Sequence, residues 1–79
     1  MAGGMGLTRT ESRLLDYLKD RAGQTVSARE LLREVWGYDD DHTATVAVHI
    51  RHLRLKVEPD PSRPVHLVTV RGQGYSYRP

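Results

Sequence analysis

The sequence predicts an α+β fold in which three helices are followed by a C-terminal β-hairpin. Three stretches place hydrophobic residues at helical spacing, and capping motifs precede two of them. Two short runs rich in β-branched and aromatic residues follow, joined by a turn with two glycines. The chain has 79 residues and no cysteine, which allows one small domain without disulfides. Residues 1–6 are small and glycine-rich and predict a flexible tail or an expression remnant, so that residues 7–79 make up the domain.

The first helix is predicted to begin after Thr8. Residues 8–11 form a capping box, in which the side chains of Thr8 and Glu11 bind each other's backbone N–H groups. Gly23 is expected to end the helix. Its apolar stripe consists of Leu14, Leu15 and Leu18.

The second helix is predicted to begin after Ser27. A short extended link, residues 24–26, leads to a second capping box formed by Ser27 and Glu30. Gly37 ends this helix after fewer than three turns, and the acidic loop 38–42 follows. The residues expected to face inward are Leu31, Leu32, Val35 and Trp36.

The third helix is predicted to run from residue 43 or 44 to residue 57. Its apolar residues recur at steps of four, three and four, which indicates one buried face made of Val46, Ile50, Leu53 and Val57. His49 and Arg54 lie nearer the edge of the core, and His49 is therefore expected to pack or to cap. On a helical wheel the opposite, outward face holds Ala44, Val48, Arg51, His52 and Leu55.

The last part of the chain predicts a hairpin. Three prolines between residues 59 and 64 exclude further helix and stiffen the connection. Strands are expected at residues 65–70 and 75–78, joined around residues 71–74. The glycines of this turn permit positive φ and hold Arg71 near the tip. Tyr75 and Tyr77 alternate with polar residues and are expected to pack against the helices.

Charge is unevenly distributed along the chain. With histidines neutral, residues 1–46 carry a net charge of −2 and residues 47–79 a net charge of +4. This basic half favours a surface that faces a polyanion, although ordinary solvated surface charge gives the same composition. No apolar run approaches the roughly 20 residues needed to cross a bilayer, so no membrane contact is expected. The absence of cysteine suits the cytoplasm.

The outward face of the third helix suits the major groove of DNA. Small residues allow close approach, Arg51 and His52 can donate to guanine, and the methyl groups of Thr45 and Val48 can contact thymine. A solvated helix face with the same spacing is the alternative. At the hairpin tip, Arg71 is a cation on a narrow projection that fits a minor groove. The predicted phosphate contacts are Thr43, Arg54, Lys56 and Thr69.

The chain resembles the OmpR/PhoB-type winged-helix effector domain of bacterial two-component response regulators. The matching text covers nearly all of residues 7–79 and reads LTRTESRLLDYL, SARELLREVWGYD, TVAVHIRHLRLKVEPDPSRP and VTVRGQGYSYRP. The combination of ELLREVWG, VHIRHLR and TVRGQGY is highly specific. Each of these segments is much less specific alone.

The resemblance implies a small winged helix-turn-helix domain that regulates transcription in the bacterial cytoplasm. It implies binding to double-stranded DNA, usually as head-to-tail dimers on direct repeats, with the third helix in the major groove and the wing in the minor groove. Phosphorylation of a separate receiver domain normally activates such proteins. The loop between the second and third helices is implied to touch RNA polymerase through Gly37, Tyr38, Asp39, Asp40 and Asp41. From its composition alone, the same loop is a solvated turn that favours the helix dipole.

The sequence departs from the family pattern in two respects. Ala44, Ala47 and Leu55 stand where the family usually has basic, acidic or amide residues, which predicts lower affinity or relaxed specificity. The family also carries a four-stranded sheet before the first helix, whereas six residues precede Leu7 here. The sequence therefore predicts that this sheet is missing and that the first helix exposes an apolar patch.

Two other function classes compete with DNA binding. The apolar outward residues allow a protein-interaction module that keeps the fold and binds little DNA. His42, His49 and His52 invite a metal site, but the last two lie about 60° apart on the wheel without a fixed third ligand. Neither a catalytic triad nor a rigid pair of carboxylates is recognisable. We therefore expect no metal, no cofactor and no enzyme activity.

Overall fold

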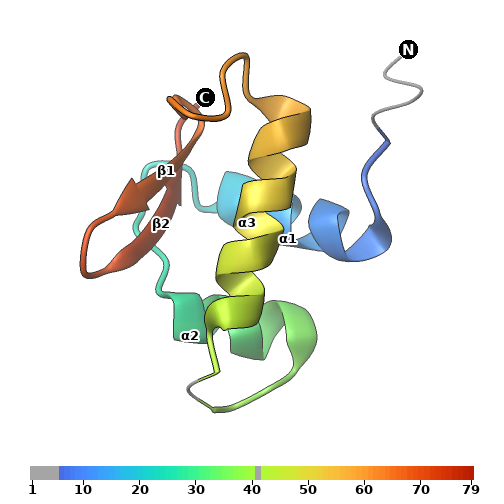
Figure 1. Ribbon diagram of the computed structural model, residues 1–79. Coiled ribbons are helices and arrows are strands. Elements are labelled where there is room, and N and C mark those ends of the chain that lie inside the picture. The colour runs from blue at the N-terminus through green and yellow to red at the C-terminus, as the bar shows by residue number, and fades with distance from the viewer. Residues whose placement is uncertain (1–5, 41) are drawn as a thin grey trace.

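The computed structural model describes residues 6–40 and 42–79. The predicted order of elements is confirmed, with three helical segments followed by an antiparallel hairpin. In Figure 1, α3 crosses in front of α1, and the hairpin lies beside α3. The elements are α1 (Arg9–Asp20), α2 (Ala28–Leu31), the π-helical turn η2 (Leu32–Trp36), α3 (Ala44–Val57), β1 (Leu67–Val70) and β2 (Gly74–Tyr77).

The capping box that begins α1 is present as predicted. The backbone N–H of Thr8 donates to Glu11 Oε1 at 2.9 Å, and that of Glu11 donates to Thr8 Oγ1 at 3.1 Å. These bonds satisfy backbone donors that have no partner inside the helix. The α-helix ends at Asp20, and turns carry the chain to Gly23, so the helix is slightly shorter than the sequence predicts.

The second helix forms with only half of its predicted capping box. Ser27 Oγ accepts from the backbone N–H of Glu30 at 3.0 Å. The carboxylate of Glu30 accepts instead from Tyr17 Oη on α1 at 2.6 Å, so a contact between helices replaces the local one. The second helix continues from α2 into η2 and ends at Gly37, where φ is +80° and a residue without Cβ is favoured.

The hairpin pairs Leu67 with Tyr77 and Thr69 with Tyr75. Its first strand begins at Leu67, two residues later than predicted, and the N–H groups of residues 65 and 66 donate to the Glu58 carboxylate. The link before α2 adds a third stretch of extended chain, since Val26 and Tyr75 exchange two backbone hydrogen bonds of 2.8 Å. This bridge joins the hairpin to the start of α2.

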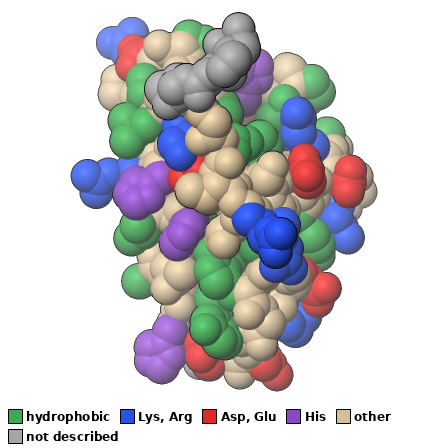
Figure 2. Space-filling model, turned by 90° about the vertical axis from the view of Figure 1, so that its right-hand side faces the viewer, with side chains coloured by type: hydrophobic (Ala, Val, Ile, Leu, Met, Phe, Trp, Pro, Cys, Tyr) green, Lys and Arg blue, Asp and Glu red, His purple; other side chains and the backbone are tan. Residues whose placement is uncertain are grey.

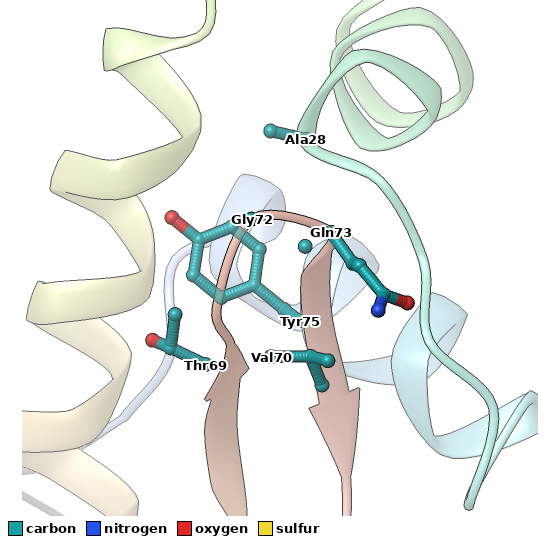
Figure 3. Close-up of a pocket in the computed structure, with 7 residues that line it drawn as sticks. Ala28, Thr69, Val70, Gly72, Gln73 and Tyr75 are labelled. Atoms are coloured by element: carbon teal, nitrogen blue, oxygen red, sulfur yellow. The ribbon is translucent and has the colours of Figure 1, made fainter.

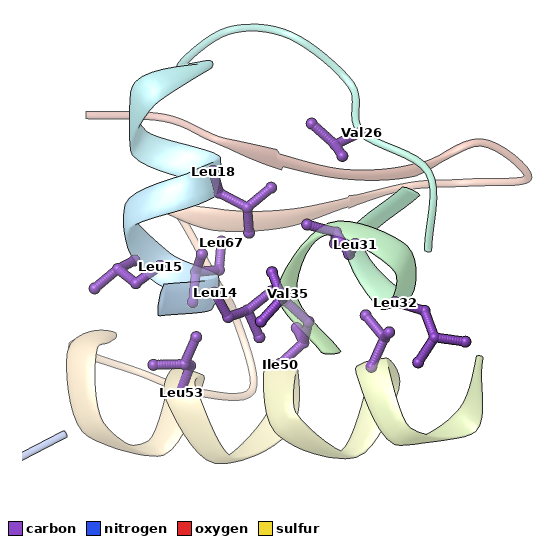
Figure 4. Packing of buried hydrophobic residues seen from close by; sticks show 11 residues of the cluster. Leu14, Leu15, Leu18, Val26, Leu31, Leu32, Val35, Ile50, Leu53 and Leu67 are labelled. Atoms are coloured by element: carbon purple, nitrogen blue, oxygen red, sulfur yellow. The ribbon is translucent and has the colours of Figure 1, made fainter. Parts of the chain in front are cut away.

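The core lies between α1, α3, the second helix and the hairpin (Figure 4). It contains residues from every element except β2, among them Leu14, Leu31, Ile50 and Leu67. Tyr75 and Tyr77 pack against this cluster, as predicted. The prediction that α1 exposes an apolar patch is wrong. Leu14, Leu15 and Leu18 are all buried, because that face of the helix belongs to the shared core.

The part of the chain that the structure describes holds no helix with both the length and the apolar character that a bilayer span requires. Of the predicted tail, residues 1–6, only Gly6 lies within the described residues. Its carbonyl oxygen accepts from Lys56 Nζ at 3.4 Å.

Candidate nucleic-acid interface

The third helix separates an apolar inner face from a polar outer one. Val46, Ile50 and Leu53 are buried in the core, as the spacing predicts. The outer residues include two hydrophobic side chains, Val48 and Leu55, which are 47% and 58% exposed. Every residue predicted for the outer face, from Ala44 to Leu55, is exposed. The helix thus presents to solvent the side that the wheel predicts.

The candidate base-contacting side chains stand clear of the rest of the molecule. Thr45, Arg51 and His52 are exposed, and no hydrogen bond or ion pair joins their side chains to another described residue. The ring of His52 lies 6.1 Å from that of His49. A surface of this kind, with a guanidinium, an imidazole and methyl groups, can meet the donor, acceptor and methyl groups of base edges.

His49 has the packing role that its place on the wheel predicts. Its Nδ1 donates to the Thr45 carbonyl oxygen at 2.8 Å, one helical turn back. Its ring meets Trp36 edge-on, with the centroids 4.9 Å apart. His49 therefore ties the start of α3 to η2, and its Nδ1 is occupied.

The tip of the hairpin carries Arg71 into solvent. The turn closes where the N–H of Gln73 donates to the Val70 carbonyl oxygen at 2.9 Å. Arg71 is exposed and has no partner among the described residues. The wing therefore presents one unneutralised guanidinium at the end of a narrow projection, which is the arrangement that side chains entering a minor groove require.

A hollow of about 310 Å³ separates the wing from the start of α2. Figure 3 shows Tyr75 and Thr69 on the side of the wing that faces α3, with Ala28 across the hollow. Sequence analysis missed Tyr75 as a lining residue of this surface. The pairing of Thr69 with Tyr75 would have found it, because residues directly opposite in a hairpin share one face.

Two predicted phosphate contacts are bonded to each other. Arg54 Nη2 donates to Thr69 Oγ1 at 2.8 Å, and Arg54 Nε donates to the Leu67 carbonyl oxygen at 2.9 Å. Arg54 is half-buried, in agreement with its predicted place at the core edge. The guanidinium thus bridges α3 and β1. Sequence analysis missed this contact, because no local pattern pairs a helical arginine with a strand thirteen residues away.

Lys56 is also engaged inside the molecule. Its Nζ donates to Glu11 Oε1 at 2.6 Å, and the Glu11 side chain is only 6% exposed. The Lys56 ammonium, followed by the Thr8 backbone N–H, holds the pKa of Glu11 below its ordinary value. Thr43 is the N-cap of α3, and its side chain makes no capping hydrogen bond to the described helix.

Glu58 anchors the root of the wing. Its carboxylate is buried and accepts from the N–H groups of residues 65, 66 and 67, with the shortest distance, 2.7 Å, to Leu67. Burial raises the pKa of Glu58, but these backbone donors outweigh burial and leave the pKa below its ordinary value. Sequence analysis missed this residue as well, since an acid after a helix is normally solvated.

The loop between η2 and α3 is exposed where it is described. Tyr38 is 58% exposed. Asp39 Oδ1 lies 3.4 Å from Arg29 Nη2, and Asp40 Oδ1 accepts from the N–H of His42 at 2.8 Å. Asp41 of the predicted polymerase contact lies outside the described residues. The described part of the loop is therefore an accessible acidic turn.

Side chains of different kinds are unevenly placed on the face that Figure 2 shows. Histidine and hydrophobic side chains gather along its left side and acidic side chains lie mostly on its right side, whereas Lys and Arg side chains occur on both sides. Within residues 6–40 and 42–79, no cluster of three or more histidine or carboxylate side chains could hold a metal ion. The exposed cations of α3 and the wing tip favour recognition of an anionic surface.

Residues 3–77 match the family model described as "Transcriptional regulatory protein, C terminal". The chain is 57% identical over 70 residues to the DNA-binding dual master transcriptional regulator RpaA of Synechocystis sp., covering 87% of this chain and 29% of RpaA. It therefore spans less than a third of the length of that relative.

Two solved structures share the fold. The Klebsiella pneumoniae RstA DNA-binding domain, in complex with the RstA box, has a TM-score of 0.86 and 30% identity, covering 92% of this chain and 73% of that one. The Thermotoga maritima response regulator DrrB, an OmpR/PhoB homologue, has a TM-score of 0.85 and 30% identity, covering 94% and 34%. These relatives are regulators and not enzymes, in agreement with the predicted class.

Proposed function

The chain belongs to the family of C-terminal domains of transcriptional regulatory proteins, of the OmpR/PhoB winged-helix type, and from this premise we propose that it binds specific sequences in double-stranded DNA. It would serve as the effector domain of a cytoplasmic bacterial response regulator. One observation carries the proposal. The outer face of α3 and the tip of the wing expose Arg51 and Arg71, which have no partners among the described residues.

In the proposed complex, α3 lies in the major groove. Arg51 and His52 donate to guanine acceptors, and the methyl groups of Thr45 and Val48 contact thymine methyl groups. The exposure of all four side chains supports this arrangement. Ala44 and Ala47 leave the backbone of the helix close to the base edges, but they contribute no hydrogen bonds of their own.

Arg71 enters the adjacent minor groove, and backbone contacts fix the register. Narrow minor grooves concentrate negative potential, which attracts a guanidinium on a thin projection. The hydroxyl groups of Thr43 and Thr69 are the proposed phosphate donors. Arg54 and Lys56 were predicted for the same role. Their cationic groups are bound within the chain, so we propose that they act on phosphates mainly through their charge.

Further contacts belong to the proposal as well. The exposed acidic loop that includes Tyr38, Asp39 and Asp40 suits a contact with RNA polymerase, and two copies of the domain would bind direct repeats head to tail. Asp41, outside the described residues, completes the predicted loop. These two contacts rest on the family and on the accessibility of the loop.

A second function is supported by one observation. Val48 and Leu55 expose hydrophobic side chains on the outer face of α3, and such a strip suits a partner helix. In this alternative the chain is a protein-interaction module with little DNA binding. Titration with random duplex DNA separates the two, because DNA binding shifts the amide resonances of α3 and the wing together.

Selection from a pool of random duplexes is the decisive experiment. We expect enrichment of a short sequence, and of a direct repeat when two copies bind. Arg51→Ala should relax the preference at one base pair, whereas Arg13→Ala, on the exposed part of α1, should leave the enriched sequence unchanged. Failure to enrich any sequence, together with no measurable affinity for duplex DNA, would contradict the proposal.

A further inference from the structure

The edge of β1 that is not paired with β2 is held by two side chains from the end of α3. Leu67 N–H donates to Glu58 Oε2 at 2.7 Å, and the Leu67 carbonyl oxygen accepts from Arg54 Nε at 2.9 Å. The N–H and the C=O of one strand residue point to the same side, so both bonds lie on the same edge. At the root of the wing, both backbone polar groups of Leu67 are therefore bonded to side chains from the end of α3.

Arg54 makes a second bond nearer to the tip. Its Nη2 donates to Thr69 Oγ1 at 2.8 Å, two residues beyond Leu67 on the same face of the strand. A guanidinium is planar and its donors have a fixed geometry. Two bonds to different residues of β1 therefore restrain both the distance and the rotation of the strand relative to α3. The donors of a lysine ammonium group rotate about a single nitrogen, so they would restrain the rotation of the strand less.

We propose that Arg54 is a positioning residue that sets the wing relative to α3, and thereby sets where Arg71 meets the minor groove. The inference rests on the proposed DNA binding and deepens it. Arg71 lies two residues beyond Thr69 and has no described partner to orient it. A two-stranded ribbon is marginally stable and twists easily by itself. The position of Arg71 must therefore be restrained by contacts that the strands make with the rest of the domain. On the β1 edge, the bond from Arg54 to Thr69 is the contact nearest to the tip among the described residues.

This role differs from the phosphate contact that the sequence predicts for Arg54. A residue that binds phosphate contributes its own part of the binding free energy, so the cost of its substitution adds to the cost of Arg71→Ala. A positioning residue acts through Arg71, so the two losses are not additive. The distinction is measurable because Arg54→Lys keeps the positive charge near the DNA while removing the bridging geometry.

The test is a double-mutant cycle on the selected duplex. We measure binding of the wild-type chain, Arg54→Lys, Arg71→Ala and the double variant. Arg71→Ala should weaken binding about tenfold in the wild-type background and about threefold or less in the Arg54→Lys background. Arg51→Ala should weaken binding by the same factor in both backgrounds, since Arg54→Lys leaves the helical backbone of α3 and the exposed side chain of Arg51 in place. Arg13→Lys is the matched control, and it should leave the factor for Arg71→Ala intact.

A second cycle guards against a folding defect. Thr69→Val removes the bond from Arg54 to Thr69 and keeps the bond to Leu67. In this background Arg71→Ala should weaken binding by a smaller factor than in the wild-type chain, and the protein should stay folded. If the wild-type chain binds the duplex and Arg71→Ala weakens binding by the same factor in every background, the inference is overturned and the proposed function stands. No duplex binding by the wild-type chain would overturn both.

Discussion

Lys56 and Glu11 form an ion pair between the last turn of α3 and the first turn of α1. Glu11 also completes the capping box, so one buried carboxylate serves two elements. An acid at this depth is costly unless it is paired and hydrogen-bonded. The predicted role of Lys56 in phosphate binding must therefore be weighed against a role in holding the two helices together.

Lys56→Met is expected to destabilise the fold, because it leaves the Glu11 carboxylate buried without its cation. Since Lys56 is itself one-quarter exposed, we expect a loss of about 1–3 kcal/mol in the free energy of unfolding. Urea denaturation measures this loss. Lys19→Met, at an exposed position on α1, is the control and should cost much less. Equal stability of Lys56→Met and wild type would show that the pair contributes nothing.

Glu58 links stability to pH. The pKa of its carboxyl in the folded chain lies below the ordinary value of 4.5, and so does the pKa of Glu11. The unfolded chain therefore binds more protons in this range. Stability should be fully present above about pH 4.5, and it should be lost as the pH falls through the folded pKa values.

Glu58→Gln tests this assignment. The amide presents N–H groups toward backbone donors, so we expect a loss of roughly 1–3 kcal/mol at neutral pH and a smaller pH slope. Urea unfolding across the acid range gives both quantities. Glu34→Gln, on the exposed face of η2, removes an equal charge as a control. A pH slope equal to that of the wild-type chain would assign the linkage to other carboxyl groups.

At the scale of elements, hydrogen bonds on both edges attach the hairpin to the rest of the domain. On the β2 edge, Val26 pairs with Tyr75 through the backbone, and the N–H of Gly23 donates to the Tyr77 carbonyl oxygen at 3.0 Å. On the β1 edge, Glu58 bonds to the start of the strand and Arg54 bonds nearer the tip. Together they explain how a short two-stranded ribbon keeps a defined orientation beside α3.

Gly74 is the position where this attachment tolerates no side chain. Its φ is +152°, and a Cβ there would overlap the Val26 carbonyl group. Gly74→Ala should therefore break the bridge and cost roughly 3 kcal/mol or more. Gly72→Ala also meets a positive φ but open space, so it should cost about 1 kcal/mol. Urea denaturation compares the two variants, and equal losses would refute a steric cause at Gly74.

At the scale of the whole molecule, four of the six Lys and Arg residues in residues 47–79 lie on α3 or at the tip of the wing, the elements that form the candidate interface. Arg51 and Arg71 stand at the helix face and at the wing tip, while Arg54 and Lys56 lie nearer the core. Acidic residues dominate the first half of the chain, whose helices form the rest of the domain. The small net charge of +2 therefore hides a separation of charge.

Binding to DNA should weaken strongly with salt, because phosphate contacts release counterions. With about four to six such contacts, the plot of log K against log salt concentration should have a slope of about −4 to −5. Fluorescence anisotropy on the selected duplex measures this slope. Arg71→Ala should make it shallower by about one, and Arg9→Ala on α1 should leave it unchanged. An affinity independent of salt would contradict an interface with the phosphate backbone.

Local sequence patterns determined the elements and their exposed faces. Apolar spacing predicted the buried side of α3, the capping motif placed the start of α1, and the glycine-bounded turn predicted the wing. These features depend on neighbours within about four residues, and such spacings are directly visible in a sequence. The outward position of Arg51 and the exposure of Arg71 follow from the same patterns.

The partners of the charged side chains depend on how distant segments pack. Arg54, Lys56 and Glu30 each bind a residue at least thirteen positions away, where no periodicity predicts a contact. The burial of Leu15 was likewise decided by how the elements pack, against the expected exposed patch. The physical reason is the same in each case. A hydrogen bond or an apolar contact between distant segments exists only after the chain has folded and brought them together.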